Sequence, residues 1–188
     1  MRIYEVRHDV EKYQSVSFCD EKLWASDMFP FDCYPPKGDA WRVQEVYVLN
    51  PKLRSGDFTY LCSGVLVFRE TALNALLDLF EMSGEILPLH VEGSNEQLYL
   101  HNVLECPNAL DQQKTEWHTS STSGKRLSIK RHVLHKNRLF ESPLFKVPES
   151  CRASVLTFSG MKDARDEFKS RYEEAGLTGL YFIEECVL

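Results

Sequence analysis

The sequence repeats one order of local patterns, with the two copies about ninety residues apart. The first copy, residues 63–91, has an apolar run, an amphipathic run and, after Gly84, a second apolar run. The second copy, residues 153–184, has the same order, with Gly176 in the place of Gly84. Each copy is typical of a strand, a helix, a glycine that ends the helix, and another strand. Any helix between two strands gives this pattern, so duplication and coincidence are both open interpretations.

The first amphipathic run predicts a helix whose apolar residues recur at three- and four-residue spacing. These residues are Leu73, Leu76, Leu77 and Phe80. Because this run is apolar over much of its circumference, we expect its helix to lie centrally in the fold. Gly84 is expected to supply the left-handed turn that ends the helix.

The second amphipathic run predicts a more peripheral helix, because charged residues surround a narrow apolar stripe. The stripe consists of Met161, Ala164, Phe168, Tyr172 and Ala175. We expect Ser159 to cap the helix at its N-terminus and Gly176 to end it.

The remaining segments indicate further strands, most of them in hairpins. Strands are expected at 2–6 and 45–49, a hairpin at 86–104, and a second hairpin with arms 116–119 and 126–134. The prediction is an α+β fold with mixed, mostly antiparallel sheets and two strand-helix-strand units, at about 63–91 and 153–184. Residues 1–188 are expected to form a single domain. The alternative is two lobes in close contact that meet near 105–115.

Residues 13–40 predict a long ordered loop, because prolines interrupt several aromatic side chains. The aromatic residues at its centre are Phe29, Phe31 and Tyr34. So much apolar surface is not typical of a flexible linker.

The sequence favours a protein that stays in the cytoplasm. No apolar run reaches the length of about 18 residues that a membrane span needs, and the first residues do not resemble a signal peptide. The six cysteines, at positions 19, 33, 62, 106, 151 and 186, contain no C-x-x-C pair. We therefore expect reduced and mostly buried thiols.

Charge is distributed unevenly along the chain, whose net charge is −6. Between Trp117 and Arg138 there are six Lys or Arg residues and no acid, so the other residues sum to −6 minus 6, or −12. From Leu61 to Glu116, nine acids face only Arg69 and Lys114. Such asymmetry bears on partners rather than on the fold.

Most sequence motifs of catalysis are missing, including the serine elbow, the phosphate-binding loop, the zinc helix and the dinucleotide-binding glycines. His90 and His101 would share a strand face near Glu92 in one hairpin register, but spacing fixes no third metal ligand. Cys62 is expected to be a buried strand residue, and His132 and His135 to be solvated. We expect no metal and no cofactor.

Several segments resemble, in the same order along the chain, a family of bacterial immunity proteins from polymorphic toxin systems. This family is the eleventh in the usual numbering of such immunity families. The matching segments between residues 60 and 183 are Val67-Phe68, Gly84 to Leu89, Leu98 to Val103, Asn108 to Asp111, Leu144 to Pro148, and Ala175 to Phe182. Members of this family protect a cell from antibacterial toxins that are secreted or delivered by contact, as in type VI secretion, by binding the toxin.

The resemblance implies a cytoplasmic toxin inhibitor without enzymatic activity. It transfers no catalytic or contact residue. From the charge pattern we expect an acidic docking face for the toxin, formed by Asp78, Glu81, Glu85, Glu92 and Glu96. The alternatives are a cysteine-dependent hydrolase, and a nucleic-acid-binding module that uses the basic segment 117–138.

Overall fold

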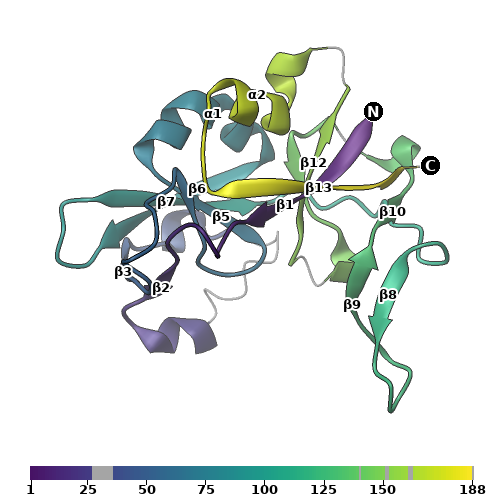
Figure 1. The fold of residues 1–188 in the computed structure, drawn as a ribbon, viewed down its shortest axis with the longest axis horizontal. Coiled ribbons are helices and arrows are strands. Elements are labelled where there is room, and N and C mark those ends of the chain that lie inside the picture. Colours follow the sequence, from purple (N-terminus) through teal and green to yellow (C-terminus); the bar gives the residue numbers. More distant parts are fainter. Residues whose placement is uncertain (27–35, 140, 151–152, 161–162, 188) are drawn as a thin grey trace.

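Two mixed sheets and one small hairpin sheet make up the protein, and both α-helices lie on the same side of the two larger sheets (Figure 1). The computed structural model describes residues 1–26, 36–139, 141–150, 153–160 and 163–187. Within these residues there are thirteen strands and two α-helices. The predicted α+β class with mixed sheets is therefore confirmed. The aromatic residues Phe29, Phe31 and Tyr34 lie outside the described residues.

The larger sheet has six strands in the order β2-β3-β6-β7-β5-β4. Their bounds are β2 (Val16–Phe18), β3 (Gln44–Val48), β4 (Phe58–Thr59), β5 (Val65–Phe68), β6 (Gly84–Val91) and β7 (Gln97–Val103). Only the β3–β6 pairing of this sheet is parallel. Helix α1 (Glu70–Ser83) lies between β5 and β6 in the sequence, and β7 lies between these two strands in the sheet.

The second sheet has five strands in the order β10-β13-β1-β12-β11. Their bounds are β1 (Arg2–His8), β10 (Val133–Leu134), β11 (Leu144–Phe145), β12 (Val155–Ser159) and β13 (Leu180–Val187). Strand β1 is antiparallel to both β12 and β13. Helix α2 (Phe168–Glu174) lies between β12 and β13 in the sequence. In both large sheets, the strands before and after an α-helix thus flank a third, antiparallel strand.

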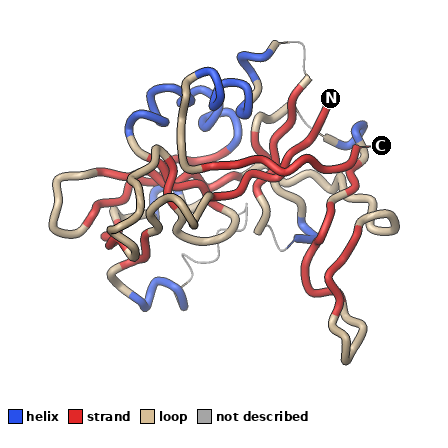
Figure 2. Tube along the Cα trace, in the orientation of Figure 1, coloured by secondary structure: helices blue, strands red, loops and turns tan. Residues whose placement is uncertain are grey.

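The third sheet is a hairpin of β8 (Glu116–Thr119) and β9 (Arg126–Arg131), which projects from the rest of the molecule (Figures 1 and 2). We call residues 116–131 the basic hairpin. The sequence predicts a second arm at 126–134, but β9 ends at Arg131 and the next strand, β10, pairs with β13 of the five-stranded sheet.

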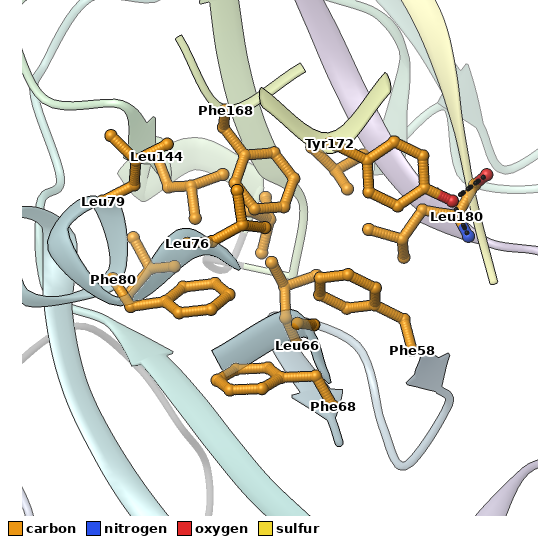
Figure 3. Packing of buried hydrophobic residues seen from close by; sticks show 14 residues of the cluster. Phe58, Leu66, Phe68, Leu76, Leu79, Phe80, Leu144, Phe168, Tyr172 and Leu180 are labelled. Atoms are coloured by element: carbon orange, nitrogen blue, oxygen red, sulfur yellow. Dashed lines mark hydrogen bonds between the residues drawn. The ribbon is translucent and has the colours of Figure 1, made fainter. Parts of the chain in front are cut away.

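One core cluster lies beneath the helices and takes residues from both large sheets (Figure 3). Phe68 of β5 stacks on Phe80 of α1, with 4.2 Å between the ring centroids and 7° between the planes. Phe58 of β4 contacts the rings of Phe168 and Tyr172, which come from α2. Because both helices bury their apolar side chains in the same cluster, the two sheets are held together by apolar packing.

Helix α1 lies where the sequence predicts a helix, but its buried face is narrower than predicted. Leu76 and Phe80 are fully buried, whereas Leu77 is 42% exposed. No helix in the described residues is long and apolar enough to cross a membrane.

The predicted start of the second helix is wrong. Ser159 ends strand β12, and Asp163 instead caps a short 3₁₀ helix, Ala164–Asp166, by accepting a hydrogen bond from the Arg165 N–H at 2.9 Å. The α-helix begins only at Phe168. Its predicted end is confirmed, because Gly176 has a φ of 64°, in the left-handed region. Met161, from the predicted apolar stripe, lies outside the described residues.

Gly84 does not have the predicted left-handed conformation. Its φ is 173°, which is extended, and it is the first residue of β6. A Cβ atom at this position would lie 2.1 Å from the carbonyl oxygen of Asn102 on β7. The residue is therefore needed for close approach of two strands rather than for a turn.

Candidate functional site

A cleft of about 580 Å³ opens where the basic hairpin meets the two large sheets. Its volume lies within the usual range of ligand sites. Its walls come from β1, β13, the β4–β5 connection, residues 153–155 and the basic hairpin. The lining side chains with polar or aromatic groups include Arg7, His8, Tyr60, His118, Ser128 and Tyr181. Because these segments are far apart in the sequence, no local pattern predicts the cleft.

Arg7 and Glu5 form an ion pair in the cleft wall. Glu5 Oε2 accepts hydrogen bonds from Arg7 Nε at 2.8 Å and Nη2 at 2.7 Å. Glu5 is nearly buried, whereas about half of the Arg7 side chain is exposed. The guanidinium thus presents positive charge to the cleft, although Glu5 offsets much of it.

Cys62 also lies in the cleft wall, where a hydrolase would need a reactive thiol. Burial raises the pKa of this thiol to about 12, and the opposing effect of Lys146 is smaller. Catalytic cysteines have pKa values well below the ordinary one, because the thiolate is the nucleophile. The local environment therefore shifts Cys62 in the wrong direction for catalysis.

Cys62 is buried as expected, but it lies in a bend between β4 and β5 and not in a strand. The expectation of mostly buried thiols does not hold for the other described cysteines. Cys19, Cys106 and Cys186 are only partly buried. Cys33 and Cys151 lie outside the described residues.

His8, a half-buried histidine of the cleft wall, is not arranged as a charged partner for a thiolate. Burial lowers the pKa of His8 to about 4, so the ring is neutral near pH 7. The ring packs edge-on against Tyr60 with 5.5 Å between centroids. Its Nε2 atom has no hydrogen-bond partner among the described residues.

Three of the five acids that we predicted as a docking face are engaged within the molecule. Asp78 pairs with Arg171 at 3.1 Å, and this hydrogen bond lowers the pKa of the Asp78 carboxyl. Glu96 pairs with Arg69 at 2.6 Å. The third is Glu85, whose contacts are more extensive.

Glu85 has a clear structural role at the start of β6. Its carboxylate accepts hydrogen bonds from the backbone N–H groups of Lys37 and Gly38, at 2.7 and 2.8 Å. It also accepts one from the Asn102 side-chain amide at 2.8 Å. The side chain thereby joins the 37–38 loop to β6 and β7.

The remaining two acids, Glu81 and Glu92, are exposed but lie far apart along the fold. Glu81 is on α1, while Glu92 follows the end of β6. Seven residues of extended chain separate Glu85 from Glu92, or about 23 Å. Strand β6 thus keeps Glu85 and Glu92 apart, near its two ends.

The basic hairpin is exposed on both faces beyond its base. Trp117 and Ile129 pair across it and pack against a core cluster of the five-stranded sheet. Arg126 lies over the Trp117 ring, 4.6 Å from its centroid, and Lys130 pairs with Glu116 at 2.9 Å. The base of the hairpin is therefore held in place, while its basic side chains face solvent.

The expectation that His132 is solvated is wrong. His132 is 2% exposed and its Nδ1 lies 3.1 Å from Glu185 Oε1 on β13, while its backbone N–H donates to Glu185 Oε2 at 2.7 Å. His135 is partly exposed and lies 3.5 Å from Asp111. His132 follows Lys130 and Arg131 in the sequence, and it is buried where β10 pairs with β13.

The two histidines of the β6–β7 hairpin do not approach each other. His90 lies opposite Gln97, whereas His101 lies opposite Ile86, four residues earlier in β6. This spacing separates them by about 13 Å. Among the residues that the structure describes, there is no group of three His, Cys, Asp or Glu side chains that could hold a metal ion.

Neither the models of known protein families nor the curated proteins include a match to this chain.

Proposed function

We propose that this chain is an immunity protein, which binds a cognate antibacterial toxin in the cytosol of the producing cell and neutralises it. The observation that carries the proposal is an ordered, exposed hairpin beside an open cleft, a shape suited to enclosing part of another protein. The ordered resemblance to the immunity-protein family over residues 60–183 supports it. A toxin inhibitor needs rapid and long-lived binding, which complementary charge and well-packed contacts supply.

The chemistry of the cleft supports binding over hydrolysis. The thiol of Cys62 is held in its protonated form, and the nearby His8 ring is held neutral. A cysteine-dependent hydrolase needs the opposite pair of shifts, so that a thiolate stands beside an imidazolium.

We infer that the scaffold of this binding protein consists of two strand-helix-strand units, at about 63–91 and 153–184. The order β5-α1-β6 and the order β12-α2-β13 support this interpretation, since each pair of strands flanks one antiparallel strand. Most of the segments that resemble the immunity family lie in these units and in β7, which are core elements. The resemblance therefore concerns mainly the scaffold, and it assigns no toxin contact.

Co-expression with the toxin encoded by the adjacent gene tests the proposal. We expect cells that express the toxin alone to stop growing, and cells that also express this protein to grow. A catalytically inactive toxin should co-purify with the protein. Growth arrest despite normal amounts of folded protein would contradict the proposal.

A further inference from the structure

We propose that the basic hairpin and the adjacent cleft bind an acidic, extended segment of the partner protein. This inference deepens the proposed function and rests on it, because it names the chemistry of the toxin surface that is recognised. It also differs from the acidic docking face that the sequence suggested.

The charge of the hairpin favours an acidic ligand. Its basic residues are Lys125, Arg126, Lys130 and Arg131, all exposed, and its only acid is Glu116. Four positive charges and one negative charge give the hairpin a net charge of +3, so the rest of the chain sums to −6 minus 3, or −9. The positive charge is thus concentrated on a projecting element, where it acts on an approaching partner at short range.

The hairpin is pre-organised for binding. At its tip, the Ser120 N–H donates to the Lys125 carbonyl at 2.8 Å, and the Gly124 N–H donates to the Ser120 carbonyl at 2.9 Å. Gly124 has a φ of 67°, which lets the chain reverse there. Because these bonds and the packing at the base already order the hairpin, binding need not supply that ordering free energy.

The cleft continues the binding surface from the hairpin onto the five-stranded sheet. His118, Ser128 and Ile129 form its wall on the hairpin side. Tyr181 of β13, which is 43% exposed, and the half-exposed Arg7 lie on the sheet side. An extended segment lying across the hairpin would therefore meet basic side chains first, and then aromatic and polar groups in the cleft.

A protein segment fits this surface better than a nucleic acid does. The rest of the chain carries about three times as much negative charge as the hairpin carries positive charge. A nucleic acid has uniform negative charge, which the net negative charge of the rest of the chain disfavours. A protein can place acids against the hairpin and basic or neutral residues elsewhere.

Charge reversal on the hairpin tests the inference. The variant carries Lys125→Glu and Arg131→Glu, and the matched control carries Lys22→Glu and Lys52→Glu, which are exposed lysines outside the hairpin. Both variants change the net charge by −4, so any difference between them reports on position. The probe is a catalytically inactive form of the toxin encoded by the adjacent gene, and association is followed at low and physiological salt after a check that both variants are folded.

We expect at least a tenfold lower association rate for the hairpin variant, with weaker salt dependence, and less than a threefold change for the control. Equal effects in both variants, with tight binding by the unmodified protein, would overturn this inference and leave the proposed function intact. A lack of binding by the unmodified protein would remove both. Hairpin-dependent binding of a 20-nucleotide single-stranded RNA, with toxin association unchanged by the variant, would assign the hairpin to nucleic acid instead.

Discussion

Asp57 and Thr178 are 121 residues apart in the sequence but form a reciprocal set of hydrogen bonds. Asp57 Oδ2 accepts from the Thr178 N–H at 2.9 Å and from its hydroxyl at 2.7 Å. Thr178 Oγ1 in turn accepts from the Asp57 N–H at 3.1 Å. Asp57 precedes β4 of one sheet and Thr178 precedes β13 of the other, so these bonds join the two large sheets.

We expect Thr178→Val to lower the free energy of unfolding by about 1–3 kcal/mol, because it leaves part-buried polar groups without a partner. Urea unfolding followed by circular dichroism measures the change. Thr122→Val, at the exposed tip of the basic hairpin, is the control and should change stability by less than about 0.5 kcal/mol. A similar stability for both variants would show that the hydrogen bonds between Asp57 and Thr178 contribute little to the free energy of unfolding.

Leu76 and Leu77 are neighbours on α1 in very different environments. Leu76 is fully buried, whereas Leu77 is 42% exposed. Leu76→Ala should cost about 2–5 kcal/mol, because it leaves a cavity in the core under the helices. Leu77→Ala should cost less than about 1 kcal/mol, since helix propensity is hardly changed. Thermal or urea unfolding of the two variants compares them directly, and equal losses would mean that α1 is rotated from its described orientation.

Glu85→Ala should destabilise the protein by about 1–3 kcal/mol, because it removes the acceptor for two backbone N–H groups and the Asn102 amide. Glu81→Ala, on the exposed side of α1, should have an effect within about 0.5 kcal/mol. Chemical denaturation measures both. If Glu85→Ala leaves stability unchanged and instead slows toxin association, Glu85 acts as a contact residue, as the sequence pattern suggested.

Cys62 should resist alkylation by iodoacetamide at pH 8 in the folded protein. With a pKa of about 12, only about one Cys62 thiol in ten thousand is ionised at that pH. Mass spectrometry of the labelled peptides should show Cys62 modified only after unfolding in urea. Rapid labelling of Cys62 in the native state would revive the interpretation of the chain as a cysteine-dependent hydrolase.

Stability should fall as the pH is lowered from 7 to 5, partly because of His101. This side chain is fully buried beneath α1, with its Nε2 at 3.0 Å from the Phe80 carbonyl oxygen, and burial lowers its pKa to about 3. The unfolded chain binds a proton near pH 6.5 and the folded chain does not, so acid favours unfolding between these two pKa values. The expected loss from this residue is about 2 kcal/mol between pH 7 and pH 5.

His101→Leu should remove that part of the pH dependence. Urea titrations of the variant and the unmodified protein at pH 7 and pH 5 give the comparison. His8, with its pKa lowered to about 4, retains a similar contribution in both proteins. An unchanged difference between the two pH values in His101→Leu would show that folding does not lower the pKa of His101.

Sequence patterns predicted elements whose shape depends on local periodicity. The α1 helix follows from the spacing of its apolar residues, and the stop at Gly176 follows from the need for a left-handed residue after a helix. The prediction for Gly84 failed because the same residue type meets a different need there, the approach of the Asn102 carbonyl on another strand. That need arises from strand pairing, which local spacing does not encode.

The candidate site could not be predicted from the sequence, because strand pairing between distant segments assembles it. The cleft combines β1 near one end of the chain with β13 near the other, and with the basic hairpin between them in the sequence. His132 shows the same limit, since its burial depends on Glu185, 53 residues away. The charge of the hairpin was visible in the sequence, but its projection beside a cleft was not.

The mass of the species formed with the toxin tests the central claim, that this protein acts by covering another protein. Light scattering on a sizing column would be applied to a micromolar mixture of this protein and the inactive toxin encoded by the adjacent gene. We expect a single complex whose mass is the sum of whole numbers of both chains. Two separate peaks, each with the mass of the isolated protein, would contradict the claim.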